Sequence, residues 1–311
     1  MLLAYQSDIY HCILSHCYLP LRHVIKRAIM RKILIPTDFS DNAMNALKYA
    51  SELFKYDTSE FFIMHAYQDE IYNDKGLLSR KNLAEVTAVI SNQSKLQLEA
   101  VLKQINNIYP NPRHSYKIIS TNATLVDETD KIVVEKEIDI IVMGTRGKTN
   151  DRSLTFGSHT LQVLKYVQCP VMAIPENYKY TQPKHILFPT NYMIPYSKRE
   201  LKLLSYMIAP YRSIVDILYV SMSKKLSLRQ EDNRDFIKGE LRKNEVNFKT
   251  VKSKNIINAI YVYMKGTPID MLVMVNTRHS FLENILYEST IDKMSLYLDI
   301  PFLALQNIKR Y

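Results

Sequence analysis

Three of the six glycines in the chain, Gly144, Gly147 and Gly157, fall in one connection between an apolar segment and a helical one. Glycine lets a ligand come close to the main chain, and it also allows positive φ angles in sharp turns. Ser158 follows the last glycine and is expected to begin a helix, whose first N–H groups and dipole favour an anion. The spacing suits a cradle for a polyphosphate. It is equally compatible with a tight turn that contains a left-handed glycine and a serine cap, and the spacing alone leaves both open.

Two basic residues lie in the same connection, Arg146 and Lys148. Both can approach a phosphate, arginine as a fork and lysine as a point charge. They are equally compatible with ordinary solvated loop charge. The connection has no Gly-Lys-Ser/Thr tripeptide and no G-x-G-x-x-G pattern, so it is neither a P-loop nor a dinucleotide fingerprint.

The sequence offers no clear catalytic constellation. His65 ends an apolar segment, and we expect it to be packed and hydrogen-bonded and not catalytic. Cys169 precedes Pro170 at the start of a buried strand and is expected to be inert. The three cysteines form neither a metal-ligand pattern nor a disulfide framework, which favours a reduced, cytoplasmic setting.

Short apolar runs alternate with helical patterns along the whole chain. Continuous Val/Ile/Leu runs of this kind predict a parallel sheet covered on both faces, in a doubly wound, Rossmann-like α/β fold. Ligands in such sheets bind outside the carboxyl ends of the strands, which is where the glycine connection begins. The expected strands are 32–37, 61–67, 116–120, 139–143, 169–174, 185–190, 214–220, 247–251, 270–275 and 301–305; the expected helices are 41–56, 78–108, 123–137, one from 158, 198–209, 232–244, 257–265 and 282–298.

The chain also repeats itself. Residues 32–40, KILIPTDFS, return at an offset of 153 as HILFPTNYM, and residues 137–147, EIDIIVMGTRG, return at an offset of 131 as PIDMLVMVNTR. The second copy is therefore shorter by 153 − 131 = 22 residues in its middle. The repeat predicts two tandem domains, 31–177 and 183–311, with the boundary inside 175–184. Residues 1–30 are expected to be an extension outside the fold, and a membrane-surface helix is the alternative.

The pattern G-x₂-G-x₉-G-S after a strand, together with the opening KILIPTDFSDNAMNAL, resembles the universal stress protein family. The resemblance covers both copies, so the chain looks like a tandem member of that family. Members with this glycine pattern bind ATP, and the resemblance therefore implies an ATP-binding regulatory or stress-response protein. The sequence does not reveal whether Mg²⁺ accompanies the nucleotide.

The resemblance also implies roles for individual residues. Asp38 would meet the adenosine, since a carboxylate repels phosphate and suits hydroxyls or an amine. The main chain around His65 would face the adenine edge, and the glycines would lie along the ribose and phosphates. His159 departs from the small or apolar residue common in the family. The implied ATP-binding set is Pro36, Thr37, Asp38, Met64, His65, Ala66, Met143, Gly144, Thr145, Arg146, Gly147, Gly157, Ser158, His159 and Thr160.

The second copy has lost this pattern. The alignment replaces glycines 144, 147 and 157 with Val275, Arg278 and Glu288, and it replaces Asp38 with Asn191, while Ser289 matches Ser158. We expect the second domain not to bind ATP and to be structural. Universal stress protein domains commonly dimerise by pairing their last strands, so the resemblance implies that segments 170–175 and 301–306 pair within the chain as an internal pseudo-dimer. A simple linker between two unpaired domains is the alternative, and further oligomerisation stays open.

The net charge of +10 is uneven along the chain. Residues 1–30 carry 3 − 1 = +2, residues 31–180 carry 18 − 18 = 0, and residues 181–311 carry 20 − 12 = +8. Acids are mixed among these basic residues, which favours a solvated surface over a nucleic-acid interface. No apolar run reaches the ~20 residues that span a bilayer. Besides a nucleotide-binding regulator, two functions stay open: a slow ATPase, and a nucleotide-free scaffold that binds an anionic partner through the basic second half.

Overall fold

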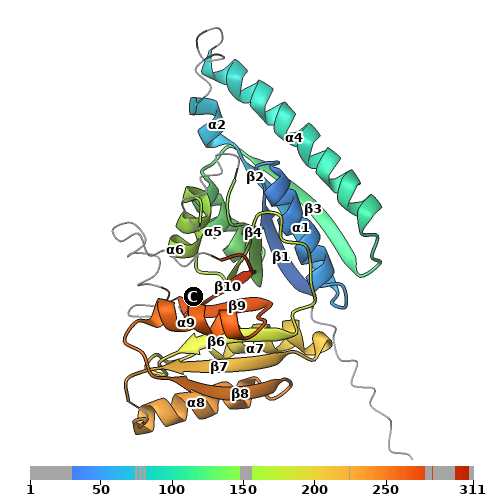
Figure 1. Cartoon of the computed structure of the whole chain (residues 1–311). Coiled ribbons are helices and arrows are strands. Elements are labelled where there is room, and N and C mark those ends of the chain that lie inside the picture. The colour runs from blue at the N-terminus through green and yellow to red at the C-terminus, as the bar shows by residue number, and fades with distance from the viewer. Residues whose placement is uncertain are drawn as a thin grey trace, which may run out of the picture.

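The computed structural model describes residues 30–307 apart from 74–75, 77–78, 80–81, 148–155, 224, 277–281 and 283–297. It has the predicted α/β class and is built on one ten-stranded sheet, with the strand order β3-β2-β1-β4-β5-β10-β9-β6-β7-β8 (Figure 1). Neighbouring strands are parallel except β5 and β10, which pair antiparallel at the centre. Two parallel five-stranded halves therefore meet at one central pair.

The first half contributes the strands β1 to β5 and their helices. Its elements are β1 (Arg31–Pro36), α1 (Asp41–Leu53), β2 (Ser59–Ala66), α2 (Gln68–Asn73), α4 (Leu83–Ile108), β3 (His114–Thr121), α5 (Leu125–Glu135), β4 (Ile140–Gly144), α6 (Ser158–Tyr166) and β5 (Val171–Ile174). The second half contributes β6 to β10. Its elements are β6 (His185–Thr190), α7 (Lys198–Ile208), the 3₁₀ turn η1 (Ala209–Tyr211), β7 (Ile214–Val220), α8 (Leu228–Glu240), β8 (Glu245–Val251), α9 (Ile256–Gly266), β9 (Met271–Asn276) and β10 (Phe302–Gln306).

The two halves share their strand register residue for residue. Ile33 of β1 pairs with Ile140 of β4, and Ile186 of β6 pairs with Met271 of β9, at the offsets of 153 and 131 found in the sequence. An aspartate precedes β4 and β9 alike: Asp139 Oδ2 accepts from the Lys32 amide at 3.0 Å, and Asp270 Oδ2 accepts from the His185 amide at 2.9 Å. This correspondence supports the sequence repeat.

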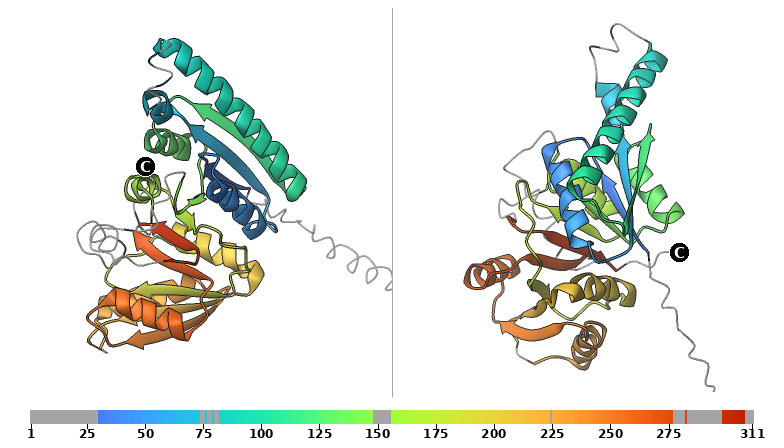
Figure 2. Two further views of the ribbon diagram at one scale, coloured as in Figure 1. Left: turned by 45° about the horizontal axis from the view of Figure 1, so that its top comes forward. Right: turned by 90° about the vertical axis from the view of Figure 1, so that its right-hand side faces the viewer.

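The sheet carries one core layer on each face, as its strands are apolar in both directions. Buried side chains of α1, α4, α7 and α8 pack on one face, and those of α5, α6 and α9 pack on the other. Figure 2 shows these helices on the two sides of the sheet, with α4 extending beyond the strands.

Two helices differ from the sequence expectation. The expected helix 78–108 is α4, which begins only at Leu83 because the Asn82 side chain caps it by accepting from the Glu85 amide. Helix α8 begins at Leu228 and not at 232, since Ser227 and Gln230 form a capping box. The short helix α2 was not expected, and the expected helix 282–298 lies almost entirely outside the described residues.

The predicted pairing of the two terminal segments is confirmed. Phe302, Leu303 and Ala304 of β10 lie opposite Ala173, Met172 and Val171 of β5, in an apolar central pair. Away from the sheet, the Tyr211 hydroxyl donates to the Leu53 carbonyl at 2.6 Å and to the Glu52 carbonyl at 3.0 Å. The halves thus touch directly and are not only joined by a linker. Within the part of the chain that the structure describes, no helix has the length and apolarity to cross a membrane.

Candidate functional site

The carboxyl ends of β1, β2 and β4 surround a cavity of about 110 Å³, which we call the β1–β4 pocket. Parallel strands bring these ends to one edge of the sheet, where the connections to the helices leave room for a ligand. The lining residues are Pro36, Thr37, Asp38, Ala43, His65, Ala66, Asp69, Glu70, Leu125, Met143, Gly144, Arg146, Gly147, His159 and Thr160.

Gly144 ends β4 against the side chain of Asn42 in the first turn of α1. A Cβ atom on residue 144 would lie 2.5 Å from Asn42 Nδ2, which real Cβ contacts do not reach. The same Nδ2 donates to the Arg146 carbonyl at 2.9 Å. Asn42 is 7% exposed, and its Oδ1 atom has no hydrogen-bond partner within the described structure. Asn42 therefore fixes the glycine loop to α1, and only glycine leaves room for it.

Gly147 lies against the carboxylate of Asp38. A Cβ atom there would stand 2.6 Å from Asp38 Oδ2. The other carboxylate oxygen, Oδ1, accepts from the Ser40 amide at 3.0 Å and from the Ser40 hydroxyl at 2.6 Å. These bonds hold the Asp38 side chain at the start of α1, with its second oxygen beside the glycine loop.

Gly157 brings the start of α6 back to the same loop. Its amide donates to the Thr145 carbonyl at 2.8 Å, and a Cβ atom on it would lie 3.4 Å from Arg146 Cα. Thr160 Oγ1 in the first turn of α6 donates to the Gly144 carbonyl at 2.8 Å. The first amides of an α-helix have no partner inside the helix, and no side chain caps α6. The arrangement can accept an anion at this end of the pocket.

The turn interpretation of the glycines is wrong in two respects. None of the described glycines has a positive φ, and Gly157, not Ser158, is the N-cap of α6. Ser158 is the first helical residue, as predicted. The glycines are therefore explained by close approach of Asn42, Asp38 and the loop backbone, and not by a left-handed conformation.

Most of the residues implied by the family resemblance lie together around the pocket. Four of them do not line it: Met64, Thr145, Gly157 and Ser158. Met64 is fully buried, and its carbonyl accepts from the Thr37 amide at 2.8 Å. Thr145 is bound on both sides, since its amide donates to the Ile174 carbonyl at 2.8 Å. These residues support the lining residues without lining the pocket themselves. Lys148 lies outside the described residues.

His65 is packed and hydrogen-bonded, as the sequence suggested. Its ring is 3% exposed, Nδ1 lies 2.9 Å from Ser94 Oγ, and Nε2 lies 3.4 Å from Glu70 Oε1. The ring of Phe39 stacks at a tilt, 4.5 Å away between centroids. His65 therefore forms a fixed wall of the pocket. Cys169 is also buried, and its Sγ lies 3.7 Å from the Ile138 carbonyl oxygen.

Two acidic residues of the pocket, Asp69 and Glu70, were missed by the sequence analysis. They lie on α2, which directly follows the carboxyl end of β2, and that position was the available signal. His159 Nε2 lies 3.6 Å from Asp69 Oδ2, and Arg146 Nη1 lies 4.0 Å from Glu176 Oε2. Acidic side chains of α2 thus lie next to the start of α6, whose first amides favour an anion. Within the described ranges, no group of three His, Cys, Asp or Glu side chains could hold a metal ion.

The corresponding place in the second half is nearly filled. The cavity there measures about 20 Å³ and is lined by Thr190, Asn191, Tyr196 and Val275 among others. Tyr192 stacks on Tyr219 at 5.3 Å, and Gln230 Nε2 donates to the Asn191 carbonyl at 2.8 Å. Arg278, Glu288 and Ser289 lie outside the described residues.

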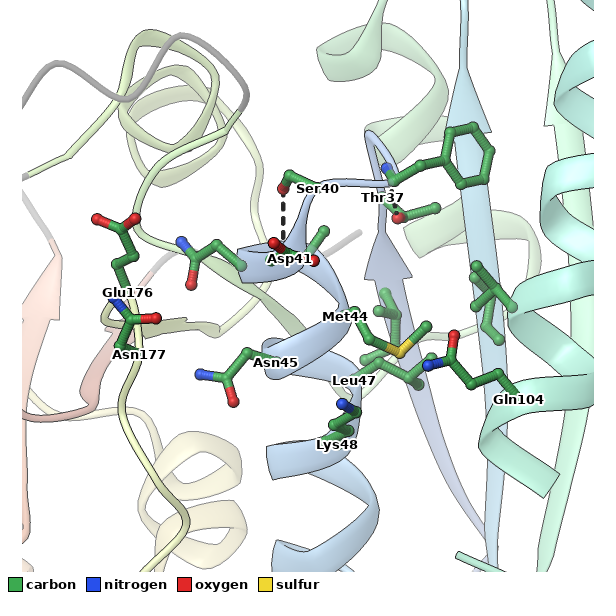
Figure 3. A pocket seen from close by; sticks show the side chains of 16 residues that line it. Thr37, Ser40, Asp41, Met44, Asn45, Leu47, Lys48, Gln104, Glu176 and Asn177 are labelled. Atoms are coloured by element: carbon green, nitrogen blue, oxygen red, sulfur yellow. Dashed lines mark hydrogen bonds between the residues drawn. The ribbon is translucent and has the colours of Figure 1, made fainter. Parts of the chain in front are cut away.

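A larger cavity of about 510 Å³ runs along α1, between the segment after β5 and helix α4. In Figure 3, Glu176 and Asn177 lie on one side of α1 and Gln104 lies on the other. Asn42 lines this cavity, whereas Gly144 and Arg146, which it contacts, line the β1–β4 pocket. The unpartnered Oδ1 atom of Asn42 is buried, so a ligand in the larger cavity could not reach it.

The comparisons with known proteins agree with this geometry. The model of the universal stress protein family matches residues 30–175, which contain β1 to β5 and the whole β1–β4 pocket. The first half of the chain belongs to the universal stress protein family. Two universal stress proteins of Methanocaldococcus jannaschii are each 27% identical, one over 156 residues (46% of this chain, 94% of the relative) and one over 163 residues (50% and 92%).

Solved structures extend the likeness in fold to both halves of the chain. The universal stress protein from Archaeoglobus fulgidus superposes with a TM-score of 0.63 at 17% identity, covering 88% of this chain and 96% of that one. A Pseudomonas aeruginosa protein described as functionally unknown gives a TM-score of 0.55 at 11% identity, covering 90% and 94%. At these identities the likeness shows the fold alone.

Proposed function

We propose that this universal stress protein binds ATP in the β1–β4 pocket and acts as a nucleotide-dependent regulator in a stress response. The observation that carries the proposal is the bare main chain at Gly144 and Gly147, beside the uncapped start of α6. A Cβ atom at Gly147 would displace the Asp38 side chain, which lines the pocket, and one at Gly144 would displace Asn42, which holds the glycine loop. The counterpart cavity in the second half is much smaller, about 20 Å³ against about 110 Å³.

The charges of the pocket favour one orientation of the ligand. Asp38 accepts hydrogen bonds, so its side suits the ribose hydroxyls or the adenine amine. The phosphates suit the first amides of α6 and the Arg146 guanidinium, which favour an anion. Asp69 and Glu70 repel phosphate, and Asp69 lies beside His159 in the first turn of α6, so a cation between the carboxylates and the phosphates would favour binding. Mg²⁺ dependence is therefore part of the test.

We further infer that residues 31–177 and 183–311 are two copies of one domain that form an internal pseudo-dimer through β5 and β10. The shared strand register and the antiparallel pair support this inference. In this arrangement the second domain serves structure and not nucleotide binding. The compartment we propose is the cytoplasm.

The experiment is a thermal-shift measurement on the full chain with adenosine, ADP and ATP, each with and without Mg²⁺. A ligand that binds only the folded state stabilises it by about 2.7 kcal/mol at a concentration 100 times its Kd. We expect ATP to raise the unfolding temperature and adenosine to raise it less. No shift with ATP at about 100 times a micromolar-range Kd, with or without Mg²⁺, contradicts the proposal.

A further inference from the structure

Helix α6 is contacted by the second half of the chain at both of its ends. At its carboxyl end, Asn276 Nδ2 donates to the Leu164 carbonyl at 2.8 Å, and Gln306 Nε2 donates to the same carbonyl at 3.3 Å. At its amino end, the ring of Phe156 lies 5.5 Å from the ring of Phe302 on β10, between centroids. Phe156 immediately precedes the N-cap Gly157.

Asn276 and Gln306 donate to the Leu164 carbonyl, which accepts no hydrogen bond within α6. Leu164 lies in the last turn of α6, where backbone carbonyls have no partner further along the helix. Gln306 is only 2% exposed, and its Oε1 atom has no hydrogen-bond partner among the described residues. Burying an amide with one unsatisfied atom costs free energy. The hydrogen bond from Nε2 to the Leu164 carbonyl offsets part of this cost.

The repeat explains why these donors lie where they do. Asn276 ends β9 and corresponds, at the offset of 131, to Thr145 directly after Gly144 in the first half. The antiparallel pairing of β5 and β10 places the carboxyl end of β10 beside the amino end of β5, which α6 precedes. The carboxyl end of β9 therefore contacts α6 of the first half, whereas the carboxyl end of its counterpart β4 borders the ligand pocket.

We propose that the second half positions the phosphate side of the nucleotide site, with Asn276 and Gln306 as positioning residues that fix α6. A helix of nine residues is about 13 Å long and behaves as a short rigid rod. Fixing its last turn and the residue before its N-cap therefore fixes its first amides relative to Gly144 and Gly147. This inference rests on the proposed function, because it assigns the α6 amides to the phosphates. The degenerate half is then a preorganising element that lowers the ordering cost of binding.

The test compares ATP and adenosine binding to the full-length wild type, Asn276→Ala, Gln306→Leu and the double variant by titration calorimetry. Loss of a hydrogen bond that orders α6 is expected to weaken ATP binding about three- to tenfold. Adenosine lacks the phosphates that the α6 amides would hold, so its affinity should change less than twofold. Hydrogen exchange on the nucleotide-free proteins should show faster exchange in α6 but unchanged exchange in α5.

Asn307→Ala is the matched control, because the Asn307 amide also donates to a backbone carbonyl, that of Pro195 inside the second half. It should leave both affinities unchanged. Equal weakening of ATP and adenosine, or ATP affinity within twofold of wild type in the double variant, overturns the inference. Where the double variant fails to fold, the single variants and their α6 exchange rates decide in the same way. A wild type that binds neither ligand contradicts the proposed function, whereas the exchange rates of α6 still test the contact from the second half.

Discussion

The Oδ2 atom of Asp38 occupies the space beside Gly147, 2.6 Å from where a Cβ atom on residue 147 would stand. The two residues are far apart in sequence and meet because β1 and β4 are neighbours in the sheet. Any side chain at 147 must displace the carboxylate that we assign to the ribose or adenine. This makes the glycine a direct test of the proposed site.

Gly147→Ala should therefore weaken nucleotide binding. The displaced Asp38 loses its place beside the ligand, and a hydrogen bond to a charged group contributes about 1.5–3 kcal/mol, so we expect roughly a tenfold or greater rise in Kd. Calorimetric titration with ATP measures this change in Kd. Gly239→Ala is the matched control, since a Cβ atom there meets nothing within 4 Å, and it should bind ATP like the wild type. Unchanged affinity in Gly147→Ala would remove Asp38 from the site.

A double-mutant cycle should detect the contact between Gly144 and Asn42. Gly144→Ala forces Asn42 to move, which we expect to destabilise the fold by about 1–3 kcal/mol in urea unfolding. In an Asn42→Ala background the obstructing amide is gone, so the same glycine substitution should cost about 1 kcal/mol less. The Arg146 carbonyl, 3.2 Å from the added Cβ, keeps part of the cost. Strictly additive costs would show that the two side chains do not compete for this space.

Each chain should bind one nucleotide. The second-half cavity of about 20 Å³ is bordered by Tyr196 and Val275 where the first half has open space and Gly144. Calorimetry should therefore fit one site per chain, and Gly147→Ala should reduce the whole signal and not half of it. A second site of similar affinity that survives this substitution would show that the second half also binds nucleotide.

The stability of the protein should fall at alkaline pH because of its buried tyrosines. Burial raises the pKa of Tyr180 to about 12, and burial also raises the pKa of Tyr211 and Tyr49. A raised pKa in the folded state means that the folded protein holds protons that the unfolded chain releases. The stabilisation is therefore complete below the unfolded pKa of about 10 and is lost as the pH rises above it. The urea midpoint should be constant from about pH 7 to 9 and fall from about pH 10 upward.

Absorbance of tyrosinate near 295 nm provides the check on that prediction. The tyrosines whose pKa burial raises should ionise only together with the loss of folded structure. Reversible ionisation of every tyrosine near pH 10, with the circular dichroism unchanged, would contradict the assigned burial.

Much of the fold could be predicted because it is local or repeated. Strands β1 and β4, and their counterparts β6 and β9, are short apolar runs, and each repeat offset is constant over these segments. The convergence of Asp38, Gly144 and Gly147 followed from the rule that parallel strands end at one edge. The pairing of β5 with β10 was expected from the family resemblance, because domains of this family commonly pair their last strands.

The remaining contacts depend on packing that no local pattern contains. Asn42 reads as an ordinary polar residue in the first turn of a helix, and its partner Arg146 lies 104 residues away. Asn276 and Gln306 meet Leu164 across 112 and 142 residues. The sequence around a single polar residue at a strand end does not predict which distant carbonyl will accept its hydrogen bond. The start of α8 was missed for a simpler reason, since the capping pair Ser227 and Gln230 lies before the charged run that was taken as the helix.

The antiparallel pair at the centre of the sheet affects how the protein is made. Until β10 arrives, β5 has one side with unpaired backbone N–H and C=O groups, a surface that readily recruits strands of other chains. Val171 pairs with Ala304, so 304 − 171 = 133 further residues must be synthesised after Val171 before the pair can form. At ~5–20 residues per second that delay is on the order of ten seconds. During this interval the unpaired edge of β5 is exposed on the nascent first half. We expect a ribosome-associated chaperone to protect this edge from pairing with other chains.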